Sequence, residues 1–290
     1  MHFYRKSAIF FIFPMLTGLL VFRVVPIAAA FFASFTEWNV YAPPRWIGLA
    51  NYKELLHSAE FWNVSKQTIV FSALYTAGVC TVGLFFAVLL NQKLPAIRFF
   101  RVIYFIPVIT TVSAVGLIWS WLLSPQNGLV NSVLAALFPA YEKISWLGDK
   151  KYALFSLAAV YIWKSAGYQM ILYLAGLQGL PKELHEAAKI DGANKMQSFF
   201  RVTLPLLTPT LFFVLVVTII ESLQTFEITY SMTEGGPYGR STTLSYYIYQ
   251  YAFVHYRMGY ASGLSYVMFL FALLVTAVNY GWRRKWVNDQ

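Results

Sequence analysis

Long apolar runs separated by shorter polar stretches are the main pattern of this 290-residue sequence. A helix of about 20 apolar residues is long enough to cross the roughly 30 Å hydrocarbon core of a membrane. Runs such as residues 211–220 show no alternation of polar and apolar positions, so the pattern predicts helices and not the strands of a β-barrel. The six predicted spans are residues 7–34, 68–90, 102–123, 152–177, 206–228 and 258–282.

Composition supports a membrane protein. Hydrophobic residues make up 58% of the chain and charged residues 12%, whereas soluble domains have roughly 45–50% and about 25%. The first run is longer than the 7–15 apolar residues of a signal peptide, so we expect it to be retained as a span. The sequence therefore predicts an all-α membrane protein with about six transmembrane helices, in a single domain over residues 1–290.

Lys and Arg residues indicate the orientation, because they are concentrated in cytoplasmic loops. With six spans, the two tails and the loops at 91–101 and 178–205 share one side, and they carry more Lys and Arg than the other three loops. Both termini are thus predicted to be cytoplasmic. The net charge of +10 arises from residues that flank helices, and no loop is long enough to form a basic face for nucleic acid.

Catalytic and metal-binding patterns are absent from the sequence. The four histidines are scattered, without an HExxH pair, and the glycine spacing of residues 78–83 lacks the Lys and Ser/Thr of a phosphate loop. We therefore expect a protein that is not an enzyme and holds no metal or cofactor. If transport uses ATP, another chain must bind it. The histidines are His2, His57, His185 and His255.

The loop at 178–205 is amphipathic, and its pattern predicts two short helices. Pro181 suits the first turn of a helix, Asp191-Gly192 predicts a bend, and residues 196–202 continue as a second helix. Such a hairpin could insert into a groove on a partner or lie on lipid headgroups.

Two separated motifs stand out in the second half of the chain. The first reads Glu186-Ala187-Ala188, three residues, Gly192, nine residues, Val202-Thr203-Leu204-Pro205. The second reads Thr233-Glu234-Gly235-Gly236-Pro237, followed by Thr242-Thr243-Leu244 and Tyr249. The first resembles the EAA loop of the membrane permeases of bacterial ABC importers, with Val202 where the family usually has Ile. The second resembles the TxGGP segment of the carbohydrate-uptake subfamily, which includes permeases for maltose, other oligosaccharides and glycerol phosphate.

This resemblance implies a type I importer permease in the bacterial cytoplasmic (inner) membrane. Its implied partners are a second related permease, a dimer of ATPase subunits that bind ATP and Mg, and an extracytoplasmic substrate-binding protein. The external loop at 232–257 would receive that binding protein at the turn of Gly235, Gly236 and Pro237, although a purely structural turn explains the same residues. The residues implied in ATPase coupling are Glu186, Ala187, Ala188, Asp191 and Gly192.

Polar residues inside the fifth span suggest a substrate path, since ionisable groups in a bilayer tend to face a cavity or a partner. Gln224, Glu227 and Tyr230 are predicted to line it, because sugars need hydrogen bonds and ring stacking, and two acids disfavour an anionic substrate. Glu221 could instead serve gating or pair between helices. Further candidates for the path are Tyr168 and Gln169, and the possible partners of Glu221 are Lys164 and Arg23.

A proton-coupled secondary transporter that uses Glu221 and Glu227 is the alternative to the importer. Such a transporter normally shows an internal repeat of helix groups, and the two halves of this sequence show none. The alternative would also need no ATPase.

Overall fold

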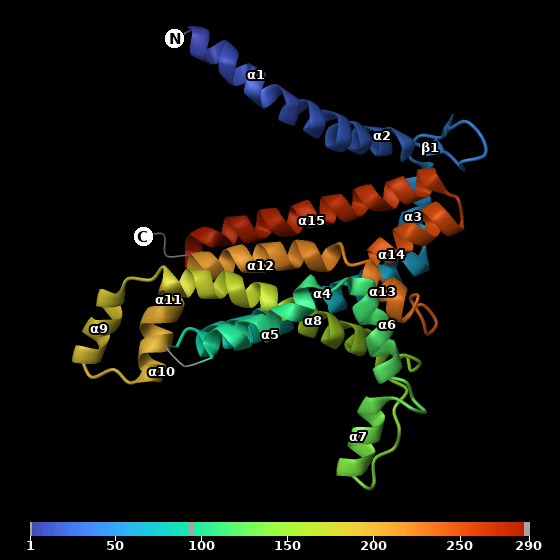
Figure 1. The fold of residues 1–290 in the computed structure, drawn as a ribbon. Helices are drawn as coiled ribbons and strands as arrows, with labels where there is room; N and C mark the ends of the chain where they lie inside the picture. The colour runs from blue at the N-terminus through green and yellow to red at the C-terminus, as the bar shows by residue number, and fades with distance from the viewer. Residues whose placement is uncertain (1, 93–95, 287–290) are drawn as a thin grey trace. The chain divides into compact units, whose positions relative to one another are not determined.

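The computed structural model describes residues 2–92 and 96–286, with side chains from residue 11 to 281, and helices dominate it (Figure 1). The chain divides into a smaller unit, Met1–Trp62 with Tyr247–Leu270, and a larger unit, Asn63–Tyr246 with Phe271–Gln290. The first half contains α1 (His2–Leu19), η1 (Leu20–Val24), α2 (Val25–Ala33), β1 (Thr36–Glu37), β2 (Arg45–Trp46), α3 (Ala50–His57), α4 (Ala59–Leu90), α5 (Ile97–Ile109), α6 (Val112–Leu122) and α7 (Leu129–Leu137). The second contains α8 (Ala153–Gln178), α9 (Lys182–Ile190), α10 (Lys195–Ser198), η2 (Phe199–Thr203), α11 (Leu204–Leu206), α12 (Thr208–Leu223), α13 (Glu227–Met232), α14 (Leu244–Tyr249), η3 (Gln250–Val254) and α15 (Met258–Trp286).

The smaller unit begins with a long helical stretch, α1 to α2, which matches the first predicted span. The π-helical segment η1 lies just before Pro26, whose missing N–H cannot join the regular ladder of helix hydrogen bonds. The short strands β1 and β2 pair antiparallel after α2. The first described span is therefore helical throughout, with one local change of hydrogen-bond register.

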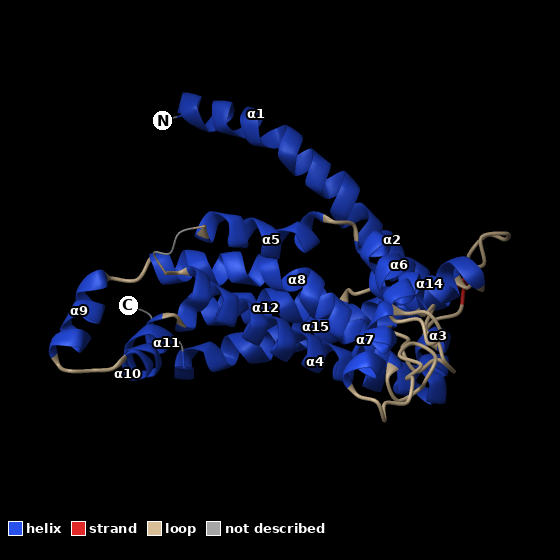
Figure 2. Cartoon of the chain, turned by 60° about the horizontal axis from the view of Figure 1, so that its bottom comes forward, coloured by secondary structure: helices blue, strands red, loops and turns tan. Residues whose placement is uncertain are grey.

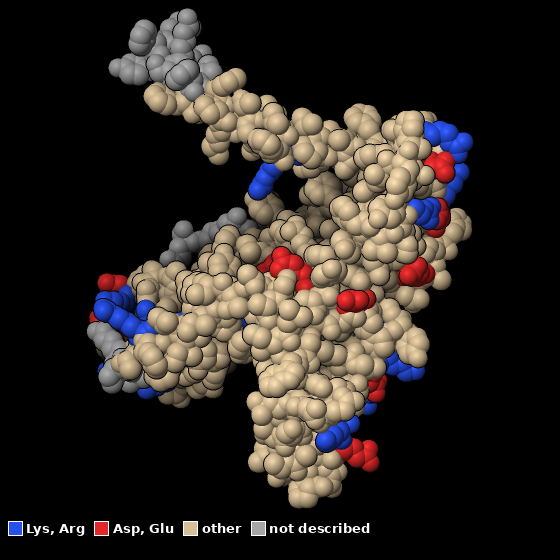
Figure 3. Space-filling model, turned by 45° about the vertical axis from the view of Figure 1, so that its right-hand side comes forward, with Lys and Arg blue, Asp and Glu red and all other residues tan. Residues whose placement is uncertain are grey.

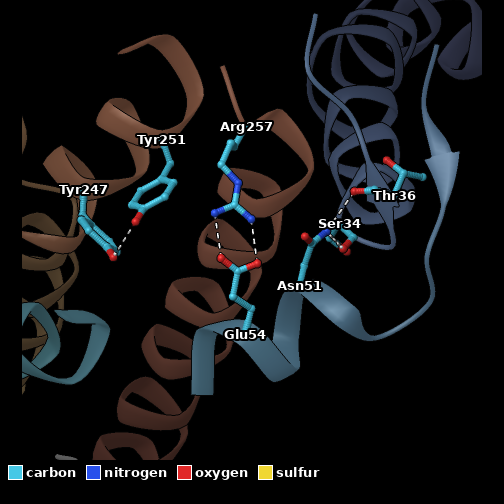
Figure 4. A network of polar contacts seen from close by, with 7 residues as sticks. All are labelled: Ser34, Thr36, Asn51, Glu54, Tyr247, Tyr251 and Arg257. Carbon is cyan, nitrogen blue, oxygen red and sulfur yellow. Dashed lines mark hydrogen bonds and ion pairs between the residues drawn. The ribbon is translucent and has the colours of Figure 1, made fainter. Parts of the chain in front are cut away.

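Polar contacts hold the smaller unit together where α2 ends (Figure 4). Asn51 Nδ2 donates to the carbonyls of Ser34 and Thr36, each at 2.9 Å. Arg257 donates two hydrogen bonds to the Glu54 carboxylate, at 2.7 and 2.6 Å. These bonds lower the pKa of Glu54 below its usual value. The start of α15 and the helix α3 are thus joined by a bidentate ion pair.

Helix α8 is the centre of the larger unit, where α4, α5, α8 and α12 run in a similar direction (Figures 1 and 2). One apolar cluster includes Phe71, Tyr75 and Leu157, and a second includes Met170 and Val214. Glycines allow close packing against α8. A Cβ on Gly167 would lie 2.2 Å from the Tyr104 carbonyl oxygen, so α5 and α8 touch backbone to backbone.

Two predicted spans are not single straight helices. The run at 102–123 forms α5 and α6, which meet at 97° because Thr110 and Thr111 adopt extended backbone between them. The run at 206–228 forms α12, which ends at Leu223, and α13, with residues 224–226 non-helical between them. Both predictions of one continuous helix were wrong, because apolar composition does not reveal a local turn.

Some of the helices are long and apolar enough to cross a membrane. Among the described residues, three helices are long and apolar enough to span a membrane, or five if each bent pair counts as one span. The bent pairs are 97–109 with 112–122, and 195–206 with 208–223. The count of six spans and the cytoplasmic position of both termini stay predictions. The three helices are Phe11–Ala33, Ala59–Leu90 and Met258–Gly281.

Candidate functional site

A helical hairpin made of α9, α10 and η2 forms one end of the larger unit (Figure 1). Helix α9 ends at Asp191, and Gly192 has φ of +80°, a left-handed conformation that favours glycine. The second helix begins at Lys195, because Asn194 and Gln197 each accept a 2.9 Å hydrogen bond from the other's backbone N–H. The predicted bend at Asp191-Gly192 is therefore present.

The hairpin encloses a groove of about 1240 Å³ against the ends of α4 and α8. Glu186 lines this groove beside Lys182 and Lys189, so its carboxylate lies among positive charges. His185 Nε2 lies 3.1 Å from Thr203 Oγ1 and fixes α9 to η2. Figure 3 shows Lys and Arg gathered at this end.

The hairpin also carries apolar side chains that are exposed in this single chain. Of the residues predicted to couple, Ala187 and Asp191 are exposed as well, and Ala188 is half-buried. Exposed apolar residues beside polar ones are typical of a surface that a partner covers. The exposed apolar residues are Leu184, Ile190, Met196 and Phe200.

Glu221 lies in a polar cluster between α8 and α12. Tyr161 donates to one of its carboxylate oxygens and Gln169 Nε2 to the other, each at 3.4 Å. Gln169 is fully buried and also donates to Thr218 at 3.3 Å, so it is a partner of Glu221 and does not face open space. The cluster holds a carboxylate with neutral donors.

Neither cation predicted as a partner of Glu221 forms an ion pair with it. Lys164 Nζ donates to the Val108 carbonyl at 3.3 Å, and Arg23 is exposed within the smaller unit. Between the side chains that the structure describes, ion pairs join Arg45 to Glu37 and Arg257 to Glu54. The contacts of Glu221 are therefore the hydroxyl and amide groups of its own unit.

Gln224, Glu227 and Tyr230 are exposed at the junction of α12 and α13. The Tyr230 ring stacks on Phe226, with centroids 5.4 Å apart, and packs against Tyr246 at 6.3 Å. Tyr168 on α8 is also exposed. The structure thus exposes an amide, a carboxylate and a tyrosine ring at the α12–α13 junction and a further tyrosine on α8.

The turn at Gly235, Gly236 and Pro237 lies at the end of the larger unit away from the hairpin (Figure 1). Gly235 has φ of +78°, and the Gly236-Pro237 peptide is cis. Ser241 Oγ donates to the Gly236 carbonyl at 2.5 Å, and Thr243 Oγ1 donates to the Thr225 carbonyl at 2.8 Å. Side-chain hydroxyls therefore fix the turn against the start of α13.

Sequence reasoning missed several members of the polar cluster. Tyr161 and Thr218 lie in apolar runs and were assigned only to spans, although both contact the Glu221 and Gln169 pair. For Thr218 a signal exists, since it lies three residues before Glu221 and so shares its helix face. No local signal links Tyr161 to Glu221, because the contact joins residues 60 positions apart.

Comparison with known proteins decides the family. Residues 80–285 match the family described as "Binding-protein-dependent transport system inner membrane component". The chain belongs to this family. It is 36% identical to the probable ABC transporter permease protein YesP of Bacillus subtilis, over 96% of this chain and 90% of that protein. It is 35% identical to the trehalose/maltose transport system permease protein MalF of Thermococcus litoralis, over 95% and 93% of the two chains.

Solved structures of this permease fold agree. A chain from the crystal structure of the bacterial alginate ABC transporter, in complex with an alginate pentasaccharide-bound periplasmic protein, matches with a TM-score of 0.85. Identity to it is 22%, and the match covers 97% of this chain and 96% of that one. The family predicted from the two motifs is confirmed. The chain is an inner-membrane, multi-pass permease, and no finding supports the proton-coupled alternative.

Proposed function

We propose that this permease moves a sugar or oligosaccharide into the cytoplasm as a subunit of an ATP-driven importer. The observation that carries the proposal is similarity along nearly the whole chain to permeases of sugar transport systems. Their names specify trehalose and maltose, arabinooligosaccharides and sulfoquinovosyl glycerol. Gln224, Glu227 and Tyr230 support it, because a sugar is recognised by hydrogen bonds to its hydroxyls and by stacking of aromatic rings on its faces.

The substrate path then needs a second permease. The strip with Gln224, Glu227 and Tyr230 is open on this chain, and one permease supplies only one wall of a path. A related permease would supply the opposite wall and exclude water around the sugar. Tyr168 is a further candidate for the wall, whereas Gln169 and Glu221 would act behind it by holding α8 against α12. A neutral substrate suits the acidic Glu227 better than a phosphorylated polyol does.

The α9–α10 hairpin would couple the permease to a dimer of ATPase subunits, which would bind ATP and Mg. The exposed Ile190 and Met196 give apolar contact area, and Glu186 offers a carboxylate to an Arg or Lys of the ATPase. Because the hairpin follows α8 and leads through α11 into α12, a movement of the hairpin would shift both helices that hold the Glu221 cluster. Gly192 permits the tight bend that this connection needs.

The turn at Gly235 to Pro237 would receive a substrate-binding protein on the extracytoplasmic side. Tyr238 next to it is almost fully exposed, which leaves a large aromatic ring available to a partner. The hydroxyl contacts of Ser241 and Thr243 keep the turn in one shape. A fixed turn reduces the conformational entropy lost on docking.

The experiment is purification of the tagged chain from its native membrane in mild detergent, followed by identification of the associated proteins. We expect a second permease and an ATPase whose hydrolysis rises when one binding protein and its sugar are added. Screening sugars in this assay identifies the substrate. Recovery of the chain alone, with solute uptake driven by a proton gradient in vesicles, would contradict the proposal.

A further inference from the structure

The helix α7 and the loop after it form a segment in which one polar side chain of the helix, that of Asn131, points inward. Asn131 is almost completely buried. Its Nδ2 donates to the Ile144 carbonyl at 2.9 Å, and its Oδ1 accepts hydrogen bonds from Tyr141 at 2.7 Å and Trp146 at 2.9 Å. The polar side of α7 therefore faces the interior of its own segment, and that side is occupied.

The outward side of α7 is apolar. Leu129, Val133 and Leu137 follow one another at four-residue spacing, and 56%, 46% and 66% of their surfaces are exposed. Ser132 and Ala136, small residues on the same face, are exposed as well. A helix in water hides such a stripe and exposes its polar face. Because α7 does the reverse, its outer face is built for an apolar neighbour.

The direction of α7 indicates which neighbour. Helix α7 runs across the direction of α8 and α12, at the end of the larger unit away from the hairpin (Figure 1). The preceding helix α6 exposes Leu117, Ile118 and Trp121, so apolar side chains are also exposed on the bent pair that comes just before α7 in the chain. Since α12 belongs to a segment apolar enough to cross a membrane, a helix that runs across its direction would lie along the membrane plane. Its stripe would then meet the same apolar surroundings as the exposed residues of α6.

Charged side chains mark one edge of the same segment. In the view of Figure 3 the protruding segment is mostly uncharged, and its acidic and basic side chains lie along the edge that points away from the hairpin end. The loop after α7 carries Glu142, Lys143, Asp149 and Lys150, all of them exposed. Charged side chains of both signs favour water over the acyl region of a membrane.

We propose that α7 is an interfacial helix whose stripe of Leu129, Val133 and Leu137 is inserted among the acyl chains of the nearer leaflet. The charged side chains of the loop that follows then lie on the aqueous side of the headgroups. A phospholipid surface accounts for both the apolar stripe and the charged edge. A binding protein docked on this stripe would leave it in water during every cycle of release.

Spin labels test this in the full chain, in liposomes of phosphatidylethanolamine and phosphatidylglycerol. In a Cys80→Ser background, a nitroxide is attached at Val133→Cys or Leu137→Cys, with Glu142→Cys as the control on the exposed loop. Collision with oxygen, which concentrates in lipid, is compared with collision with a water-soluble nickel chelate. If these replacements disturb folding, the label is attached instead at Ser132→Cys, a smaller change on the same exposed face of α7.

We expect the ratio of oxygen to nickel collisions at the stripe positions to exceed the ratio at Glu142→Cys several-fold, with or without the binding protein. Equal ratios at stripe and control would place the stripe in water and overturn the proposal. Access to nickel that disappears only when the binding protein is added would overturn it in favour of a protein-docking surface.

Discussion

The two ends of the larger unit differ in how their loops are held. At the end with α7, Asn131 joins Tyr141 and Trp146, and Thr243 joins the turn after Gly235 to the start of α13. At the opposite end, the described contacts of the hairpin are mainly local ones, such as the reciprocal pair of Asn194 and Gln197, and its apolar residues are exposed. One end is therefore stabilised by its own side chains, whereas the other leaves apolar residues exposed that the proposed partner would cover.

The largest effect should follow Asn131→Leu. The change leaves Tyr141, Trp146 and the Ile144 carbonyl without a hydrogen-bond partner, and we expect the free energy of local opening of the segment at 124–149 to fall by about 3 kcal/mol. Hydrogen exchange resolved by peptide measures this loss. The matched control is Ser132→Ala on the exposed side of α7, and equal exchange in the two variants would contradict a self-stabilised end.

Two glycines in left-handed conformations give a direct comparison of the ends. In Gly235→Ala the new Cβ would lie 2.5 Å from Thr242 Oγ1, so overpacking adds to backbone strain and the local free energy of opening should fall by about 2 kcal/mol. In Gly192→Ala nothing lies within 4 Å of the Cβ, so only the strain of about 1 kcal/mol applies. Hydrogen exchange of the two loops would show the difference. A larger fall in the local free energy of opening for Gly192→Ala than for Gly235→Ala would contradict this comparison of the two ends.

Glu186→Ala tests whether the hairpin end depends on a partner. We expect uptake to fall roughly tenfold, which corresponds to about 1.4 kcal/mol of lost coupling, because a charge-assisted contact to the ATPase disappears. Insertion and yield should not change, since Glu186 is exposed in the isolated chain. Glu183→Ala, also an exposed carboxylate of α9, is the matched control. Normal transport by a correctly inserted Glu186→Ala variant would remove its coupling role.

The smallest effect should come from Thr203→Val, which removes the hydrogen-bond partner of His185 Nε2 but leaves the contact of Nδ1 with the Pro181 carbonyl. In the isolated chain we expect the free energy of local opening, measured by hydrogen exchange of the amides at 182–203, to fall by about 1 kcal/mol. Addition of the ATPase should reduce that loss, because the partner supplies its own contacts to α9. A loss of the same size with and without the ATPase would mean that docking does not stabilise the hairpin.

The sequence allowed most of the helices and the family to be predicted, because both depend on local patterns. The bend at Gly192 and the helix after Pro181 follow from turn and capping chemistry, and the two motifs identified the permease family. The break between α5 and α6 was missed because Thr110 and Thr111 look like ordinary members of an apolar run.

The candidate site was predicted less completely than the fold. Residues Gln224, Glu227 and Tyr230 are exposed as a path wall requires, although their role stays a prediction. The surroundings of Glu221 could not be predicted, since its contacts to Tyr161 and Gln169 join helices far apart in the chain. Charge alone suggested Lys164 as a partner, but that ammonium group bonds to a carbonyl of α5.

The glycine at position 167 has a mechanical consequence. Because its missing side chain lets α8 rest on the carbonyl of Tyr104, no side chain separates the two backbones at this point. If the hairpin is moved as proposed, α5 would therefore be displaced together with α8. The bend of 97° at Thr110 and Thr111, where α5 ends, would be the first place where this displacement could be taken up by a change in backbone angle or passed on to α6.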